Sequence, residues 1–213
     1  MSIRILHMKK IYMYVMDQMA DFEHGFILKG IGMQNMLPSK KVELCAFSLA
    51  KNPVKTNGGM TIVPDVSLDE VKKEDCSVLV LIGGEDWQSG KHGKVLDLAE
   101  DFLKSGITVA AICGATVALA DRNILDQRKH TSNGVGFLDM FSKNYKGKKN
   151  YEDIPAVKDG NLITAACTGN ILFAKLILEA AEVFNAEALD AWYDYFSTGN
   201  QAAFFKLMNL LSA

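Results

Sequence analysis

The stretch Ile107-Thr108-Val109-Ala110-Ala111-Ile112-Cys113-Gly114-Ala115-Thr116-Val117-Ala118-Leu119-Ala120 decides the fold. Its first half is an apolar run with β-branched residues, long enough for one buried strand. Its second half is rich in alanine and leucine, which predicts a helix. Only small residues, from Gly114 to Thr116, are available for the sharp turn between the two. The sequence therefore predicts a strand, a tight turn and a helix, with Cys113 at the turn.

A cysteine at this junction lies beside the first free N–H groups of the following helix. These groups and the helix dipole favour a thiolate. The arrangement is the cysteine version of a nucleophile elbow. The alternative is that Cys113 is a buried structural thiol, the usual role of a free cysteine. The position at the end of a strand favours a functional thiol.

The composition describes an ordinary globular chain. It has 213 residues, 49% of them hydrophobic, and a net charge of −2. This length suits one domain, and the near-neutral charge gives no reason to expect nucleic acid or an anionic membrane as partner. No apolar run approaches the roughly 18 residues of a membrane helix. Residues 1–7 lack the apolar core of a signal peptide. Met8 resembles an alternative translation start, so residues 1–7 are expected to be an upstream extension with no structural role. We expect a cytoplasmic protein.

The four cysteines, Cys45, Cys76, Cys113 and Cys167, are widely spaced. They form no CxxC pair and show no Cys/His metal spacing. The simplest interpretation is a reduced cytoplasmic protein with buried thiols. We expect neither a metal nor a cofactor.

Apolar strands alternate with helical patterns along most of the chain. Strands are expected at 11–16, 42–47, 77–82, 107–112 and 160–167, a hairpin at 54–63, and helices at 21–36, 92–105, 114–120 and 172–184. This alternation predicts an α/β fold, with a doubly wound, mostly parallel sheet sandwiched by helices. We expect one domain over 8–184, with 185–213 as a C-terminal helical extension packed on it. Sites in such folds lie at the carboxyl ends of strands.

Two short motifs follow other strand ends. Gly83-Gly84 follows the strand at 77–82, and glycines allow a substrate to approach the backbone closely. The Gly84 and Gly114 N–H groups could form an oxyanion hole, although an ordinary turn would also explain the glycines. Glu23 follows the first strand and is expected on the first turn of a helix capped by Asp21. Its carboxyl could exchange a proton with a thiol, or simply complement the helix dipole.

Three further side chains are weaker candidates. His130 is the best histidine for a Cys–His pair, but a polar strand position explains it equally well. His92, near a helix start, is expected to be solvated. Trp87 is expected either to wall a pocket or to pack on the surface.

Four stretches together resemble the ThiJ/PfpI superfamily, a class I glutamine amidotransferase-like group that includes the parkinsonism-associated protein deglycase. They are Asp21-Phe22-Glu23, Leu81-Ile82-Gly83-Gly84, Ala111-Ile112-Cys113-Gly114, and 119–126 with 162–165. The resemblance covers residues 9–184 and implies a flavodoxin-like fold. It also implies a nucleophilic or redox-active Cys113, a protonated Glu23 beside it, backbone donors from Gly84 and Gly114, and a homodimer.

The chain departs from this family where histidines are concerned. Many members carry a histidine directly after the cysteine, where this chain has Gly114. Deglycase- and glyoxalase-like members carry one about 20 residues downstream, where this chain has Asn133. His130 lies three residues earlier and, by strand alternation, is expected to face the opposite side from Asn133. No Cys–His–acid triad carries over, so protease and glutaminase activities are not expected.

Three functions are compatible with these residues. The first is an enzyme that uses a Cys113–Glu23 dyad on a small electrophilic substrate, such as a carbonyl, an amide or an isonitrile. The alternative is a non-enzymatic redox or stress-response protein in which Cys113 is oxidised to a sulfinate held by Glu23. The third is a ligand-binding domain in which Cys113 is a relic. His130 and Asn133 are auxiliary candidates in each.

Overall fold

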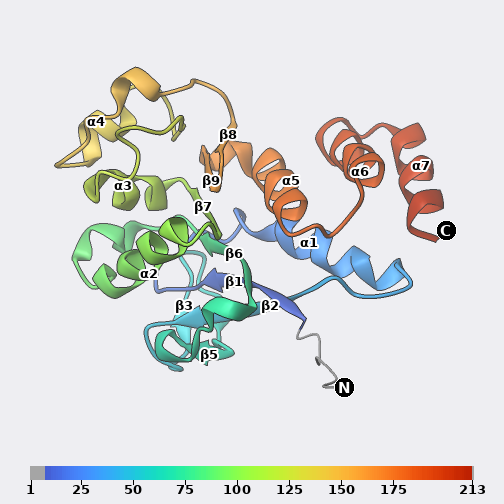
Figure 1. Ribbon diagram of the computed structural model, residues 1–213, viewed down its shortest axis with the longest axis horizontal. Coiled ribbons are helices and arrows are strands. Elements are labelled where there is room, and N and C mark those ends of the chain that lie inside the picture. Colours follow the sequence, from blue (N-terminus) through green and yellow to red (C-terminus); the bar gives the residue numbers. More distant parts are fainter. Residues whose placement is uncertain (1–7, 213) are drawn as a thin grey trace.

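A seven-stranded sheet forms the centre of the protein in a computed structural model that describes residues 8–212 (Figure 1). Its strands are β1 (Lys9–Tyr14), β2 (Val42–Ser48), β5 (Val66–Ser67), β6 (Cys76–Leu81), β7 (Thr108–Ile112), β8 (Ala156–Asp159) and β9 (Leu162–Ala165). They are ordered β5-β2-β1-β6-β7-β9-β8. All neighbours are parallel except β8 and β9. The predicted extension over residues 1–7 lies outside the described residues.

The central strands are apolar because helices cover both faces of the sheet. On one side lie α2 (Gly93–Lys104) and α3 (Gly114–Asp121), and on the other α1 (Gly25–Met33) and α5 (Asn170–Ala180) (Figure 1). Helices α3 and α5 both contact β7. The last four residues of β7, Val109 to Ile112, have no exposed surface. The predicted doubly wound α/β sheet is therefore confirmed.

The strand order places a crevice beside β1. The chain adds β2 on one side of β1 and then β6 and β7 on the other, which makes the β1/β6 boundary a topological switch point. Ligands of doubly wound sheets bind outside the carboxyl ends of the strands at such a point. The loops after β1, β6 and β7 meet there.

Short elements connect these layers. A small hairpin joins β3 (Val54–Lys55) and β4 (Thr61–Ile62), as the sequence predicted. Helix α4 (Phe137–Phe141) contacts α3. The 3₁₀ helices are η1 (Gln34–Met36), η2 (Leu68–Glu70), η3 (Lys73–Asp75), η4 (Glu85–Ser89), η5 (Lys148–Asn150) and η6 (Cys167–Gly169).

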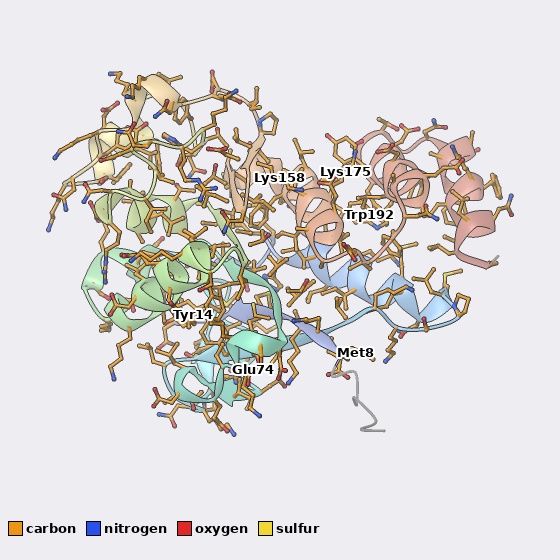
Figure 2. All side chains as sticks on the ribbon, viewed as in Figure 1. Met8, Tyr14, Glu74, Lys158, Lys175 and Trp192 are labelled. Atoms are coloured by element: carbon orange, nitrogen blue, oxygen red, sulfur yellow. The ribbon has the colours of Figure 1, made fainter. Side chains whose placement is uncertain are left out.

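Two C-terminal helices, α6 (Ala186–Thr198) and α7 (Gln201–Ser212), are joined at Gly199, whose φ of 74° is left-handed and ends α6. Trp192 of α6 has no exposed surface and meets Phe26 of α1 edge-on at 6.3 Å. Lys175 of α5 forms an ion pair with Asp190 of α6, and Figure 2 labels Lys175 and Trp192 close together. The division between a domain at 8–184 and an extension at 185–213 stays a prediction.

Within residues 8–212, none of the helices combines the length and the apolar character that crossing a bilayer requires.

Candidate active site

Cys113 lies between β7 and α3 in a strained backbone conformation. Its φ of 57° and ψ of −125° are unfavourable for any residue with a side chain. Hydrogen bonds on both sides hold this conformation. The Cys113 N–H donates to the Ala165 carbonyl (3.0 Å), and the Cys113 carbonyl accepts from the N–H (3.0 Å) and hydroxyl (2.6 Å) of Thr116. The predicted strand–turn–helix is therefore present, with the cysteine at the turn.

Glu23 is completely buried in the loop between β1 and α1. Its Oε2 accepts a hydrogen bond from the Gly83 N–H at 2.7 Å. Its Oε1 accepts no hydrogen bond from the described residues. A buried carboxylate oxygen without a donor is costly, so this oxygen is the natural place for a proton.

The position of Glu23 corrects one expectation. The first helix begins at Gly25, so Glu23 precedes it rather than forming its first turn. Asp21 is not the helix cap either, because it accepts the Gly58 N–H at 2.6 Å. The loop is instead tied to the end of β6, where the Ala20 N–H donates to the Gly83 carbonyl.

Gly83 is the point at which the carboxyl and the cysteine meet. A Cβ atom at Gly83 would lie 2.6 Å from Glu23 Oε2, 2.8 Å from Glu23 Oε1 and 2.7 Å from Cys113 Cβ. All three distances are shorter than real Cβ contacts allow. The glycine is therefore required by the close approach of these two side chains.

Gly84 and Gly114 are just as tightly placed. A Cβ atom at Gly114 would lie 2.6 Å from the Gly84 carbonyl oxygen and 3.3 Å from the Gly84 nitrogen. Both glycines line the same cavity as Cys113. Gly84 and Gly114, the two predicted backbone donors, are thus neighbours in the wall of the cavity that Cys113 lines.

Asn133 is the side chain that contacts the sulfur most directly. Its Nδ2 donates to Cys113 Sγ at 3.1 Å, and its Oδ1 accepts the Cys167 N–H at 2.8 Å. His130 is engaged elsewhere: Nε2 pairs with the Tyr145 hydroxyl and Nδ1 with the Arg128 carbonyl, both at 2.7 Å. Within residues 8–212 no histidine lines the cavity around Cys113.

Burial and the nearby Glu23 carboxylate raise the pKa of Cys113 to about 12. The Asn133 side chain lowers the pKa of Cys113, and so does the Gly114 N–H at the start of α3, as expected for a helix amide. The effects of burial and of Glu23 are larger. Burial also raises the pKa of Glu23, against the opposing Gly83 N–H. The expected thiolate is therefore disfavoured while Glu23 is charged, because two adjacent buried groups resist carrying two negative charges.

The site opens into a cavity of about 440 Å³. Its walls are mainly apolar, with Phe22, Val117, Phe137 and Phe141 among the lining residues. Trp87 also lines it, and its indole N–H donates to the Ile82 carbonyl at 2.8 Å. The expectation that Trp87 walls a pocket is confirmed. Between residues 8 and 212, no three His, Cys, Asp or Glu side chains gather to hold a metal.

Two features of the neighbourhood were not anticipated. Cys167, the first residue of η6, lines the cavity that contains Cys113. Its place at the carboxyl end of the strand predicted over 160–167 was a signal for it. His92 is 3% exposed rather than solvated, because its Nδ1 pairs with the Tyr14 hydroxyl at 2.8 Å and its Nε2 lies 3.3 Å from an Asp86 carboxylate oxygen.

A doubly wound parallel sheet with a cysteine at a strand–helix elbow, and a buried carboxyl beside it, defines an α/β protein of the nucleophile-elbow class. Comparison with known proteins narrows this class. A model of the DJ-1/PfpI family matches residues 9–180. The chain belongs to the DJ-1/PfpI family.

Relatives match almost the whole chain. The uncharacterized protease YoaZ of Bacillus subtilis is 37% identical over 206 residues, covering 96% of this chain and 98% of YoaZ. A ThiJ/PfpI family protein from Bacillus anthracis superposes with a TM-score of 0.88 at 38% identity, covering 97% and 98% of the two chains. A DJ-1 superfamily protein from Agrobacterium tumefaciens gives 0.78 at 28% identity, covering 91% and 100%. Other relatives are named deglycase or glyoxalase.

Proposed function

We propose that this protein is a cysteine-dependent enzyme that acts on a small electrophilic molecule, such as a reactive carbonyl, an amide or an isonitrile. The observation that carries the proposal is the meeting of Cys113 and Glu23 around Gly83, beside a largely apolar cavity of about 440 Å³. A cavity of this size suits a small molecule.

The proposed reaction begins with a proton transfer from Cys113 Sγ to Glu23 Oε1. This transfer gives the unpaired oxygen a proton and removes the carboxylate charge that raises the thiol pKa. The thiolate then attacks the electrophilic carbon. For a carbonyl substrate a sulfur–carbon bond forms, the carbon–oxygen double bond opens, and the oxygen takes up the negative charge.

The backbone around the sulfur supports the next step. In the proposed reaction the N–H groups of Gly84 and Gly114 donate hydrogen bonds to the developing oxyanion, a role supported by the position of both glycines in the cavity wall with Cys113. Glu23 then returns its proton to that oxygen as a general acid. One carboxyl thus serves as base and acid in turn, with no histidine.

The relatives' names suggest different activities, and the geometry favours those on small molecules. Cysteine proteases of the Cys–His type use a histidine in contact with the thiol. In this chain Asn133 occupies that contact and His130 is bonded to Tyr145. A Cys–Glu dyad beside a cavity of about 440 Å³ supports a small-molecule substrate, whichever of the relatives' names is considered.

The test is turnover of a reactive dicarbonyl, a primary amide and an isonitrile by Cys113→Ser and Glu23→Gln. We expect Cys113→Ser to abolish turnover and Glu23→Gln to lower it about 10²- to 10⁴-fold, the usual contribution of general acid–base catalysis. Cys45→Ser is the matched control, since Cys45 is a buried residue of β2 that does not line the cavity. Full activity of Cys113→Ser on a confirmed substrate would rule out the mechanism.

A redox role for Cys113 is the second candidate. It is favoured by the Asn133 amide and the buried Glu23 carboxyl, which could both hydrogen-bond an oxidised sulfur. Mild peroxide followed by mass spectrometry tests it: selective oxidation of Cys113 supports the role, and indiscriminate oxidation of all four cysteines counts against it.

A further inference from the structure

Two of the four cysteines line one cavity. Cys113 and Cys167 both belong to its wall, and both are partly exposed. A single side chain spans the space between them, because the Asn133 amide contacts Cys113 Sγ with its nitrogen and the Cys167 N–H with its oxygen. The two residues are therefore within the reach of one amide group.

The strand register explains why they are so close. Strands β7 and β9 are parallel neighbours in which Ile112 pairs with Ala165. The Cys113 N–H continues this ladder to the Ala165 carbonyl. Neighbouring strands lie about 4.8 Å apart, and Cys167 is only two residues beyond Ala165. A disulfide needs α-carbons within about 6.8 Å. The Cys113–Ala165 hydrogen bond holds the backbone of Cys113 beside the strand end from which Cys167 follows.

The other two cysteines cannot take this role. Cys45 is buried within β2, and Cys76 is the buried first residue of β6, at the amino end of the strand. Neither lines the cavity around Cys113.

We propose that Cys167 is a resolving thiol for Cys113, forming an intramolecular disulfide when a peroxide oxidises the site. This inference rests on the reactive Cys113 of the proposed function and extends it to a second residue. It makes Cys167 a modification site that protects Cys113 from irreversible oxidation.

The chemistry takes two steps and consumes one peroxide. The Cys113 thiolate attacks a peroxide oxygen, the oxygen–oxygen bond breaks, and the leaving oxygen takes the proton held by Glu23. Cys113 is now a sulfenic acid, oxidised by two electrons. Cys167 sulfur then attacks Cys113 sulfur, the sulfur–oxygen bond breaks, and the departing hydroxyl leaves as water with the Cys167 proton.

The test is treatment of the reduced full chain with hydrogen peroxide, followed by non-reducing peptide mapping with mass spectrometry. In the wild type we expect one peptide pair joined through Cys113 and Cys167, in a monomeric chain. In Cys167→Ser the cross-link disappears, and sulfenic and sulfinic acid accumulate on Cys113. Cys167→Ala should do the same, which guards against an effect of the serine itself. Cys45→Ser should behave like the wild type.

Three outcomes separate the inference from the proposed function. If Cys113 is oxidised to sulfinate equally in the wild type and in Cys167→Ser, Cys167 is not a resolving thiol. The proposed enzymatic function of Cys113 is unaffected by that result. A cross-link between two chains likewise overturns the intramolecular disulfide. If iodoacetamide and peroxide both leave Cys113 unmodified, the reactive thiol itself is disproved and both proposals fail.

Discussion

The side-chain nitrogen of Asn133 lies 3.1 Å from the sulfur of Cys113, and its oxygen accepts the Cys167 N–H at 2.8 Å. The second bond fixes the orientation of the amide, since only the oxygen can accept that N–H. The nitrogen must therefore face the sulfur. A donor held in this way stabilises negative charge on Cys113 without itself titrating, unlike a histidine at the same place.

Gly83→Ala should damage both the fold and the reactive thiol. The new methyl group would lie within 2.8 Å of both Glu23 oxygens and of Cys113 Cβ. Overpacking of this kind costs about 1–3 kcal/mol, so urea denaturation should show a matching loss of stability. Iodoacetamide modification of Cys113 should change as well, because Glu23 must move.

Gly32→Ala is the matched control for this substitution. Gly32 lies in α1 with no atom within 4 Å of an added Cβ, and alanine there should stabilise the helix by about 0.5–1 kcal/mol. Equal stability of the Gly83→Ala protein and the wild type would contradict the close approach.

Cys113→Gly should be more stable than Cys113→Ala by about 1 kcal/mol, because glycine relieves a backbone strain worth about 1–3 kcal/mol. Both variants remove the sulfur, so the lost side-chain contacts are similar. The strain follows from the φ of 57° at this residue. Urea unfolding of the two variants measures the difference. In unstrained secondary structure alanine is more stable than glycine. A Cys113→Ala variant more stable than Cys113→Gly would therefore disprove the strained elbow.

The elbow and the glycine pair could be predicted because the information is local. An apolar run that ends in small residues before a second apolar run specifies a strand, a turn and a helix whatever the rest of the chain does. The Gly83-Gly84 pair follows its strand directly, and strand ends of a parallel sheet share one edge.

The orientation of Glu23 and the burial of His92 could not be predicted in this way. Glu23 reaches Cys113 because the Ala20 N–H ties the preceding loop to the Gly83 carbonyl, a contact between distant segments. His92 is buried because Tyr14, far away in the sequence, provides its hydrogen-bond partner. The raised pKa of Cys113 likewise depends on burial and on Glu23. These three properties depend on packing between segments that are distant in the sequence, so no single segment predicts them.

Stability should fall as the pH drops below about 6.5, the pKa of an unperturbed histidine. Burial lowers the pKa of His24, His92 and His130 in the folded chain. Between the ordinary pKa and the lowered ones, the unfolded chain therefore binds more protons than the folded chain. The free energy of unfolding then rises with pH across this window and is fully regained above it. Urea denaturation at a series of pH values measures the slope.

His92→Gln isolates one of these groups. It should reduce the slope, because a glutamine does not titrate, while the contributions of His24 and His130 remain. Glu23, whose pKa is raised by burial, acts in the opposite sense at lower pH and is unchanged in this variant. An unaltered slope in His92→Gln would mean that His92 titrates normally in the folded chain.

Asn133→Asp should slow the alkylation of Cys113 more than Asn133→Ala does. Alanine only removes the donor to the sulfur, whereas aspartate also places a second carboxylate beside it, which raises the thiol pKa further. One oxygen of the aspartate can still accept the Cys167 N–H, so the loop keeps its anchor. Each added pKa unit lowers the thiolate fraction about tenfold. Iodoacetamide rates at a common pH should therefore rank wild type above alanine and alanine above aspartate; equal rates would show that the Asn133 contact has no effect on the sulfur.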